Sequence, residues 1–248
     1  MKLRADLMLV ARGLVESRAR AQALIMAGKV FSGDRAVAKA GDMLAEDVAL
    51  AVRGQDHPWV SRGGVKLDHA LRHFALSPAG RVCLDVGAST GGFTDVLLAH
   101  GAVKVHAVDV GHGQLAWKLR NDPRVVVHEK TNARYLTSET IPDPIEVLVC
   151  DASFIGLPTV LPAAQSLCAP GAWAIALIKP QFEAGPAAVG AKGVVRDKEV
   201  HRAVCDRIEA WWSKLPGWIV LGIEESPITG PEGNKEFLIG ARFDMSDV

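Results

Sequence analysis

Short apolar runs with strand character alternate with helically spaced segments along the larger part of the chain. The runs lie at residues 82–86, 103–108, 125–128, 145–150, 172–178, 218–223 and 236–243. Strands that alternate with helices favour a mainly parallel sheet covered by helices. The Pro- and Gly-rich residues 227–233 are too few for a helical crossover, so the last two strands should pair antiparallel. We therefore expect an α/β fold with a Rossmann-like, seven-stranded sheet.

The first part of the chain has a different pattern. Residues 6–28 have the spacing of two short helices interrupted at Gly13, with Ser17 as the N-cap of the second helix and Gly28 as its C-cap. Short strands are expected in the residues that follow, as far as Val52. This segment therefore resembles a small α+β unit.

A polar stretch with Pro and Gly follows these strands and indicates a linker. We expect a small α+β domain at 1–56, a linker at 57–64 and a larger domain at 65–248. An amphipathic helix at 66–74 should open the larger domain. The Gly- and Ala-rich residues 184–193 should form a mobile loop.

Charge is unevenly distributed, although the 248-residue chain has no formal net charge and 49% hydrophobic residues. Residues 1–40 contain eight Lys and Arg against three Asp and Glu, a surplus of +5. This surplus indicates either a polyanion-binding appendage or an ordinary solvated helix face.

The cysteines favour a reducing compartment. Cys83, Cys150, Cys168 and Cys205 form no Cys-x-x-Cys pair, and the first two lie inside apolar runs, so they should be small core residues. No metal site is expected. The chain also lacks an apolar window long enough to span a membrane and a signal-peptide pattern at its start, so we expect a cytoplasmic protein without membrane contact.

A glycine-rich turn follows the first of the seven runs and precedes a helical pattern. Strand, tight loop and helix form the layout of a nucleotide-type cofactor site. The loop offers Gly87, Ala88, Ser89, Thr90, Gly91, Gly92 and Phe93 as cofactor-binding residues. Its spacing, with Asp85 just before it, differs from the dinucleotide fingerprint Gly-x-Gly-x-x-Gly. An acidic group there suits a cofactor with a cationic amino-acid end, such as S-adenosylmethionine.

Two further residues at strand ends are candidates for cofactor contacts. Asp109 ends the second run, where an acidic side chain can bind ribose hydroxyls; the alternative is a helix N-cap. Asn132 follows the third run and could hydrogen-bond an adenine edge.

The candidate catalytic residues also lie at strand ends. Asp151 follows the run 145–150, Lys179 follows 172–178, and Glu236 opens the last run. Each alone could form an ordinary salt bridge at a strand end. Their combination around a cofactor loop favours chemistry, because ligands bind doubly wound sheets at the carboxyl ends of the strands.

In chain order, Lys66, Asp151, Lys179 and Glu236 match the Lys-Asp-Lys-Glu tetrad of FtsJ-like ribose 2′-O-methyltransferases, which the larger domain resembles. The whole chain resembles the TlyA family, bacterial rRNA methyltransferases historically labelled haemolysins. The matching stretches are 17–21, 62–67, 87–94, 151–155, 179–183 and 230–236. The first 60 or so residues resemble the RNA-binding module of ribosomal protein S-four. His57-Pro58 replaces the Arg-Ala that often precedes Trp-Val in the family's linker.

The resemblance implies a class I methyltransferase that transfers a methyl group from S-adenosylmethionine to a ribose 2′-hydroxyl of ribosomal RNA, at a cytidine. Lys179 would act as the base, and Lys66 would steady the developing alkoxide. Asp151 would orient Lys179 and, as a cofactor-binding residue, lie near the methyl group. Glu236 would hold Lys66 or the target ribose. Phosphate contacts would come from Arg4, Arg18, Arg20 and Lys29.

Other functions remain alternatives. They are a nonenzymatic RNA-binding or assembly factor that retains the fold, an NAD-dependent oxidoreductase and a membrane-active haemolysin. The loop spacing disfavours the oxidoreductase, and the lack of a span or a long amphipathic helix disfavours the haemolysin. The oligomeric state and the particular rRNA are left open by the sequence.

Overall fold

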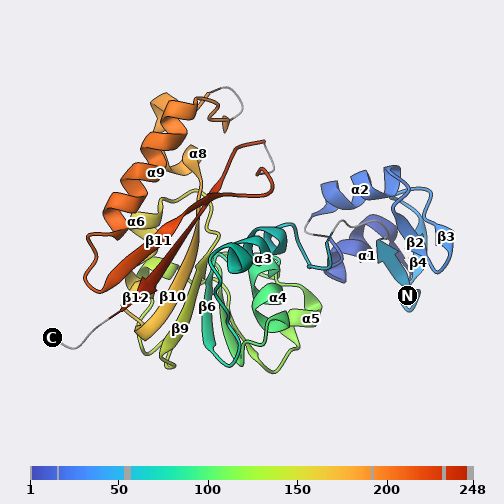
Figure 1. Cartoon of the computed structure of the whole chain (residues 1–248). Helices are drawn as coiled ribbons and strands as arrows, with labels where there is room; N and C mark the ends of the chain where they lie inside the picture. Colours follow the sequence, from blue (N-terminus) through green and yellow to red (C-terminus); the bar gives the residue numbers. More distant parts are fainter. Residues whose placement is uncertain (1, 16, 53–56, 191–192, 231–232, 245–248) are drawn as a thin grey trace.

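The structure is a computed structural model, and it describes residues 2–15, 17–52, 57–190, 193–230 and 233–244. A large α/β unit and a small N-terminal unit make up the chain, and the small unit lies to one side of the large one (Figure 1). Among the described residues, the large unit has two clusters of buried apolar side chains and the small unit has one.

A seven-stranded sheet forms the centre of the large unit, as the apolar runs predict. Its strands are β6 (Val82–Val86), β7 (Lys104–Val108), β8 (Val125–His128), β9 (Ile145–Cys150), β10 (Cys168–Ile178), β11 (Trp218–Glu225) and β12 (Phe237–Phe243). Their order across the sheet is β11-β12-β10-β9-β6-β7-β8. The five neighbouring strands β8, β7, β6, β9 and β10 all run parallel. The strand β12 pairs antiparallel with β10 and with β11, which confirms the predicted final hairpin.

The order of the strands reverses between β6 and β9. The chain leaves β6 for β7 and β8 on one side and then returns to β9 on the other. At such a switch point the loops after neighbouring strands diverge and leave a crevice at the carboxyl edge of the sheet. The loop after β6 and the residue after β9, Asp151, therefore meet at this crevice.

Helices cover both faces of this sheet (Figure 1). They are α3 (Gly63–His73), α4 (Gly92–Ala99), α5 (Trp117–Arg120), α6 (Leu157–Val160), α7 (Pro162–Gln165), α8 (Pro180–Glu183) and α9 (Lys198–Trp212), with 3-10 turns η1 (Ala133–Tyr135) and η2 (Pro186–Ala188). One apolar cluster contains buried residues of α3 and α4, and the other contains those of α6, α7 and α9. Trp212 of α9 is fully buried.

The helix α3 begins at Gly63, inside the segment expected to be linker. A Cβ on Gly64 would lie 2.3 Å from the Trp59 side chain, and one on Gly92 would lie 2.9 Å from the Gly64 nitrogen. These glycines therefore permit close packing of α3 on Trp59 and on the start of α4. Part of the expected linker, 53–56, lies outside the described residues.

The described residues of the N-terminal unit form two helices and two small sheets. Its elements are β1 (Lys2–Arg4), α1 (Ala5–Ala11), α2 (Arg18–Met26), β2 (Val30–Ser32), β3 (Arg35–Ala36), β4 (Met43–Ala45) and β5 (Leu50–Val52). Ser17 caps α2 as predicted, because its side chain accepts a hydrogen bond from the Arg20 amide. Gly28 follows the C-cap Ala27 rather than forming it, and its φ of +66° suits glycine.

Other expectations can be compared with the described residues. All four cysteines are free, and Cys83 and Cys150 are buried as predicted. No helix in the described part of the chain is both long and apolar enough to cross a membrane. The expected mobile loop at 184–193 contains η2, and its residues 191–192 lie outside the described part.

Candidate active site

The loop between β6 and α4 closely approaches the neighbouring strand end. Gly87 has a φ of +81°, and a Cβ there would lie 2.9 Å from the Ala152 backbone. Ser89 and Gly91 also have positive φ, at 47° and 96°. The Gly87 and Ala88 amides donate to the Val108 carbonyl at the end of β7. The loop thus turns tightly beside the end of β9, and its residues 87–90, 92 and 93 border the large cavity described below.

Asp85 lies behind this loop and is completely buried. Thr94 Oγ1 donates a 2.7 Å hydrogen bond to Asp85 Oδ2, whereas Oδ1 has no partner within the described residues. Burial raises the pKa of this carboxyl to about 7. Asp85 therefore braces α4 and leaves one oxygen unsatisfied. Its predicted contact with a cationic group stays a prediction.

Asp109 holds the turn after β7. Its Oδ2 accepts a 2.8 Å hydrogen bond from the Ser89 amide and its Oδ1 accepts one of 2.6 Å from Gly111. It borders a small second cavity together with Gln114 and Glu129. Glu129, which the sequence did not single out, accepts hydrogen bonds from the Gly113 amide and from Arg120.

Asn132 has a local structural contact. Its side chain accepts a 3.1 Å hydrogen bond from the Arg134 amide and thereby caps η1. Of the two cavities described in this subsection, Asn132 borders neither. The predicted bond to an adenine edge stays a prediction.

A cavity of about 990 Å³ opens at the carboxyl edge of the sheet. It is bordered by the glycine-rich loop and by all four residues of the predicted tetrad, Lys66, Asp151, Lys179 and Glu236. The structure therefore brings together side chains from α3, the end of β9, the end of β10 and the start of β12.

The four tetrad side chains form a chain of alternating charge. Lys179 Nζ lies 2.6 Å from Asp151 Oδ1, and Asp151 Oδ2 lies 3.8 Å from Lys66 Nζ. Lys66 Nζ donates a 2.6 Å hydrogen bond to Glu236 Oε2. Lys66, Lys179 and Glu236 are each at most 7% exposed. The two lysines and two carboxylates balance in charge, and such pairing lets charged side chains be buried away from water.

Two neighbours of Asp151 were missed by the sequence argument. Ser153 Oγ lies 2.8 Å from Lys179 Nζ and accepts its hydrogen bond, and the Asp151 carbonyl accepts another at 3.1 Å. Phe154 is 88% exposed, has a φ of +65° and borders the cavity. Its ring contacts Phe182 with centroids 4.9 Å apart. The exposed ring and the positive φ of Phe154 are visible only in the structure, so the sequence offered no signal for this residue.

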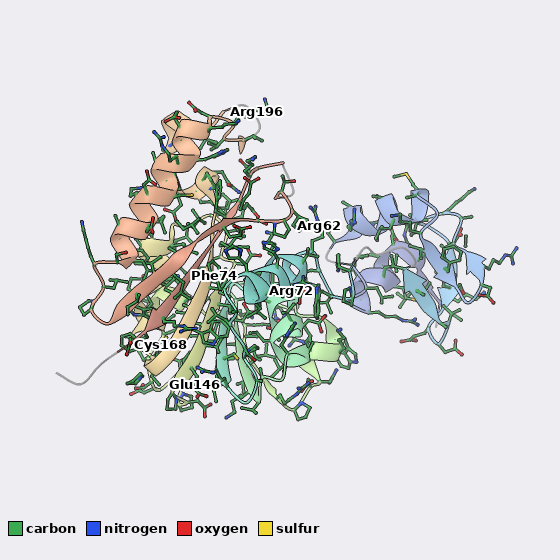
Figure 2. All side chains as sticks on the ribbon, viewed as in Figure 1. Arg62, Arg72, Phe74, Glu146, Cys168 and Arg196 are labelled. Atoms are coloured by element: carbon green, nitrogen blue, oxygen red, sulfur yellow. The ribbon has the colours of Figure 1, made fainter. Side chains whose placement is uncertain are left out.

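The rim of the cavity is held by polar contacts across the chain. Asn234 Oδ1 accepts a hydrogen bond from the Val195 amide, and a Cβ on Gly230 would lie 2.7 Å from Glu236 Oε1. Arg62 donates to the Thr229 carbonyl. Figure 2 shows Arg62 beside the start of α3, on the side of the N-terminal unit.

The four basic residues predicted to contact phosphates differ in their surroundings. Arg4 and Arg18 both pair with Asp6, at 2.9 Å each. Asp6 is fully buried, and its hydrogen bonds, that from Arg4 first, hold its pKa well below the usual range. Arg20 is exposed and borders the large cavity, and Lys29 is exposed. The structure thus places Arg20, alone of these four, at that cavity.

Comparisons with known proteins agree with this geometry. Residues 59–243 match the model of the FtsJ-like methyltransferase family. The chain is 48% identical to the 16S/23S rRNA (cytidine-2′-O)-methyltransferase TlyA of Mycobacterium tuberculosis, over 97% of this chain and 90% of that protein. It is also 48% identical to YqxC of Bacillus subtilis, named as a candidate rRNA methyltransferase, over 96% of this chain and 85% of that protein.

A solved structure has the same architecture over nearly the whole chain. It is of a candidate hemolysin from Streptococcus thermophilus, 40% identical, with a TM-score of 0.77. The match covers 99% of this chain and 90% of that one. The N-terminal unit is therefore included in the similarity.

Proposed function

The chain belongs to the FtsJ-like methyltransferase family, and from that premise we propose that it transfers a methyl group to a ribose 2′-hydroxyl of ribosomal RNA, at a cytidine. The observation that carries this proposal is the charge-balanced chain Lys179–Asp151–Lys66–Glu236, which faces the glycine-rich loop across one cavity. S-adenosylmethionine is the methyl donor of this family.

The residues around the loop fit that donor. The unsatisfied, buried Asp85 Oδ1 offers an acceptor behind the loop, where the donor's ammonium group would add positive charge. The close approach of Gly87 to the Ala152 backbone brings the loop beside the end of β9, so that the loop and Asp151 border the same cavity. Asp109, at the end of β7, would hold the ribose hydroxyls. Bound there, S-adenosylmethionine supplies a methyl group that its sulfonium charge has already activated.

The tetrad would prepare the acceptor hydroxyl. Lys179, which pairs with Asp151 in the structure, would first lose a proton to solvent. Its neutral Nζ would then take the 2′-hydroxyl proton while the oxygen bonds to the methyl carbon and the bond from that carbon to the donor's sulfur breaks, which leaves a neutral thioether. Asp151 and Ser153 orient Lys179 through contacts of 2.6 and 2.8 Å. Lys66 would stabilise the developing negative charge on the oxygen, and Glu236 fixes Lys66 from the opposite side. Most of the remaining catalytic effect would come from alignment of the two reacting atoms.

Several features support an RNA acceptor. Phe154 exposes an aromatic ring at the mouth of the cavity, where it could stack on an unpaired base. Arg20 of the N-terminal unit reaches the same cavity. Arg4 and Arg18, both fixed by Asp6, would add phosphate contacts together with Lys29.

We accordingly propose that the N-terminal unit, within residues 1–56, is an RNA-binding domain, that the linker ends before α3 begins at Gly63, and that the rest of the chain is the methyltransferase domain. Ribosomal RNA within a ribosomal subunit is the proposed partner, and the cytoplasm, where such RNA is modified, is the proposed location. A nonenzymatic assembly factor would need RNA binding but not the intact tetrad. The haemolysin alternative rests on the names of some relatives, and no helix within the described residues could span a membrane.

The proposal is tested by mapping 2′-O-methylation on ribosomal RNA from cells with and without this protein. We expect at least one methylated cytidine to lose its methyl group in cells without the protein and to regain it when the gene is restored. Restoration with an Asp151→Asn variant should fail. Identical methylation maps in the two strains would refute the proposal.

A further inference from the structure

Two histidines of α3 and one glutamate of β11 gather on the face of α3 that also carries Lys66, further along the helix. His69 and His73 lie one helical turn apart on α3, and Glu224 lies on β11. The potential ligand atoms of these three side chains all lie within 4.8 Å of one another. Within the described part of the chain, no other three His, Cys, Asp or Glu side chains have ligand atoms that lie so close together. We propose that His69, His73 and Glu224 bind a divalent transition-metal ion of the Zn²⁺ class.

The spacing on the helix favours a shared ligand. Residues four apart in an α-helix project from the same face one turn apart, so two imidazoles can reach one point. The rings of His69 and His73 stack with centroids 6.1 Å apart. Glu224 faces both rings: Oε1 lies 3.4 Å from His69 Nε2 and Oε2 lies 3.8 Å from His73 Nδ1.

These separations, 3.4 Å, 3.8 Å and at most 4.8 Å, equal or slightly exceed the edges of a coordination tetrahedron. Zn²⁺ binds imidazole nitrogen and carboxylate oxygen at about 2.0–2.2 Å, which places neighbouring ligand atoms roughly 3.3–3.6 Å apart. Small rotations of the three side chains would therefore seat the ion. Two imidazoles and one carboxylate are donors that favour Zn²⁺, Co²⁺ or Ni²⁺ over Ca²⁺ or Mg²⁺. The side chains are about a third exposed or more, so water can supply the fourth ligand.

The packing around His73 reduces the freedom of its ring. Phe74 contacts this ring edge-on, with centroids 4.8 Å apart. Phe74 itself packs against β12, where a Cβ on Gly240 would lie 2.9 Å from its ring, and Figure 2 shows Phe74 between α3 and the sheet. A fixed ring loses less entropy when it binds an ion.

The cysteines offer no comparable site. Burial raises the pKa of the Cys150 and Cys168 thiols to about 12 and that of Cys205 to about 11. Since a metal ion binds the thiolate, it would compete with a tightly held proton at each of these positions. We therefore expect a single strong site among the described residues.

The site would connect α3, which carries Lys66, to the hairpin of β11 and β12, next to Glu236. His69 follows Lys66 by three residues on α3. Glu224 of β11 is the register partner of Leu238 on β12, just past Glu236. An ion bound by His69, His73 and Glu224 would thus cross-link α3 to the terminal hairpin and hold this pair in place.

The test is a titration of the untagged, metal-free full-length protein with Co²⁺, followed by its visible absorption, and with Zn²⁺ by calorimetry. We expect saturation at one equivalent with the absorption of four-coordinate Co²⁺. His69→Ala, His73→Ala and Glu224→Gln should each weaken Zn²⁺ binding by about tenfold or more. His100→Ala is the matched control, because His100 also pairs with a carboxylate of α3, Asp68, at 3.0 Å.

Thermal unfolding gives a second measurement on the same proteins. Zn²⁺ at about 100 times its Kd should raise the Tm of the unmodified protein and of His100→Ala by roughly 5 °C or more. It should leave the Tm of the doubly substituted His69→Ala, His73→Ala protein unchanged. The inference is wrong if binding does not saturate, or if these variants bind Zn²⁺ as tightly as the control does.

Discussion

Lys66 and Glu236 lie 170 positions apart in the chain, yet Lys66 Nζ donates a 2.6 Å hydrogen bond to Glu236 Oε2 inside the cavity. Both side chains are almost completely buried. The pair joins α3 to the start of β12 and completes the alternating chain that begins at Lys179. Its position makes it both a structural link and a proposed part of the acceptor site.

Removal of one partner should therefore affect stability as well as activity. Glu236→Ala leaves the Lys66 charge without its nearest anion, and breaking a buried pair costs about 3–5 kcal/mol of unfolding free energy. The exposed pair Lys235–Glu225, next to it in sequence, is the matched control, and Glu225→Ala should cost less than about 1 kcal/mol. Denaturant unfolding of the two variants checks this difference. Equal effects would show that the buried pair contributes little.

Asp85 predicts a specific dependence of stability on pH. Its pKa, about 7 in the folded protein, lies above the ordinary value of 3.8 because the side chain is buried. The folded state thus holds the proton more tightly than the unfolded state does, so this group lowers the unfolding free energy as the pH rises from about 4 to about 7. Asp85→Asn removes this effect.

We expect Asp85→Asn to be more stable than the unmodified protein at pH 8 by up to about 4 kcal/mol, and to differ much less at pH 4. Thr94 can still donate its hydrogen bond to the amide oxygen. Urea unfolding at pH 4, 6 and 8 measures the trend. A difference in stability that stays constant over this range would contradict the assigned pKa. The same variant should bind S-adenosylmethionine more weakly.

The basic N-terminal residues should control RNA binding. Arg18→Glu and Arg20→Glu together should weaken binding to ribosomal RNA by at least about tenfold and make it less dependent on salt. Arg202→Glu, on the exposed surface of α9, is the control. Filter binding at several salt concentrations measures the RNA affinity of the double variant and of the Arg202→Glu control. Unchanged binding by the double variant would disprove the role of this surface.

Phe154 should matter for the reaction and not for stability. Its ring is exposed and its backbone is strained, so Phe154→Ala should leave the unfolding free energy within about 1 kcal/mol of the original value. Loss of a stacked base costs about 1–3 kcal/mol, which predicts a decrease in kcat/KM for RNA of about tenfold. Affinity for S-adenosylmethionine should not change. Full activity in Phe154→Ala would exclude stacking at this position.

Much of the fold could be predicted because its strands are apolar and its crossovers are helical. The rule that ligands bind at the carboxyl ends of parallel strands also explains why Asp151 and Lys179 meet the glycine-rich loop. Glu236 reaches the same cavity through the antiparallel strand β12, whose pairing the short preceding turn indicated.

Features that depend on packing between distant side chains could not be predicted. Nothing local indicates that Asn132 caps η1, that Asp6 gathers Arg4 and Arg18, or that Glu224 faces His69. The start of α3 was misplaced because Gly63 and Gly64 suggest a linker in sequence, whereas they allow close packing in the structure. Such contacts are determined by register and burial and not by local pattern.

The most direct test of the central claim is methyl transfer by the purified protein to ribosomal subunits, with S-adenosylmethionine as the donor and the product nucleotide identified. The account predicts a methyl group on the 2′-oxygen of a cytidine. It also predicts that Lys179→Ala slows the transfer by about 10²–10⁴-fold while it still binds the donor. Transfer to a base atom, or near-normal transfer by Lys179→Ala at neutral pH, would contradict it.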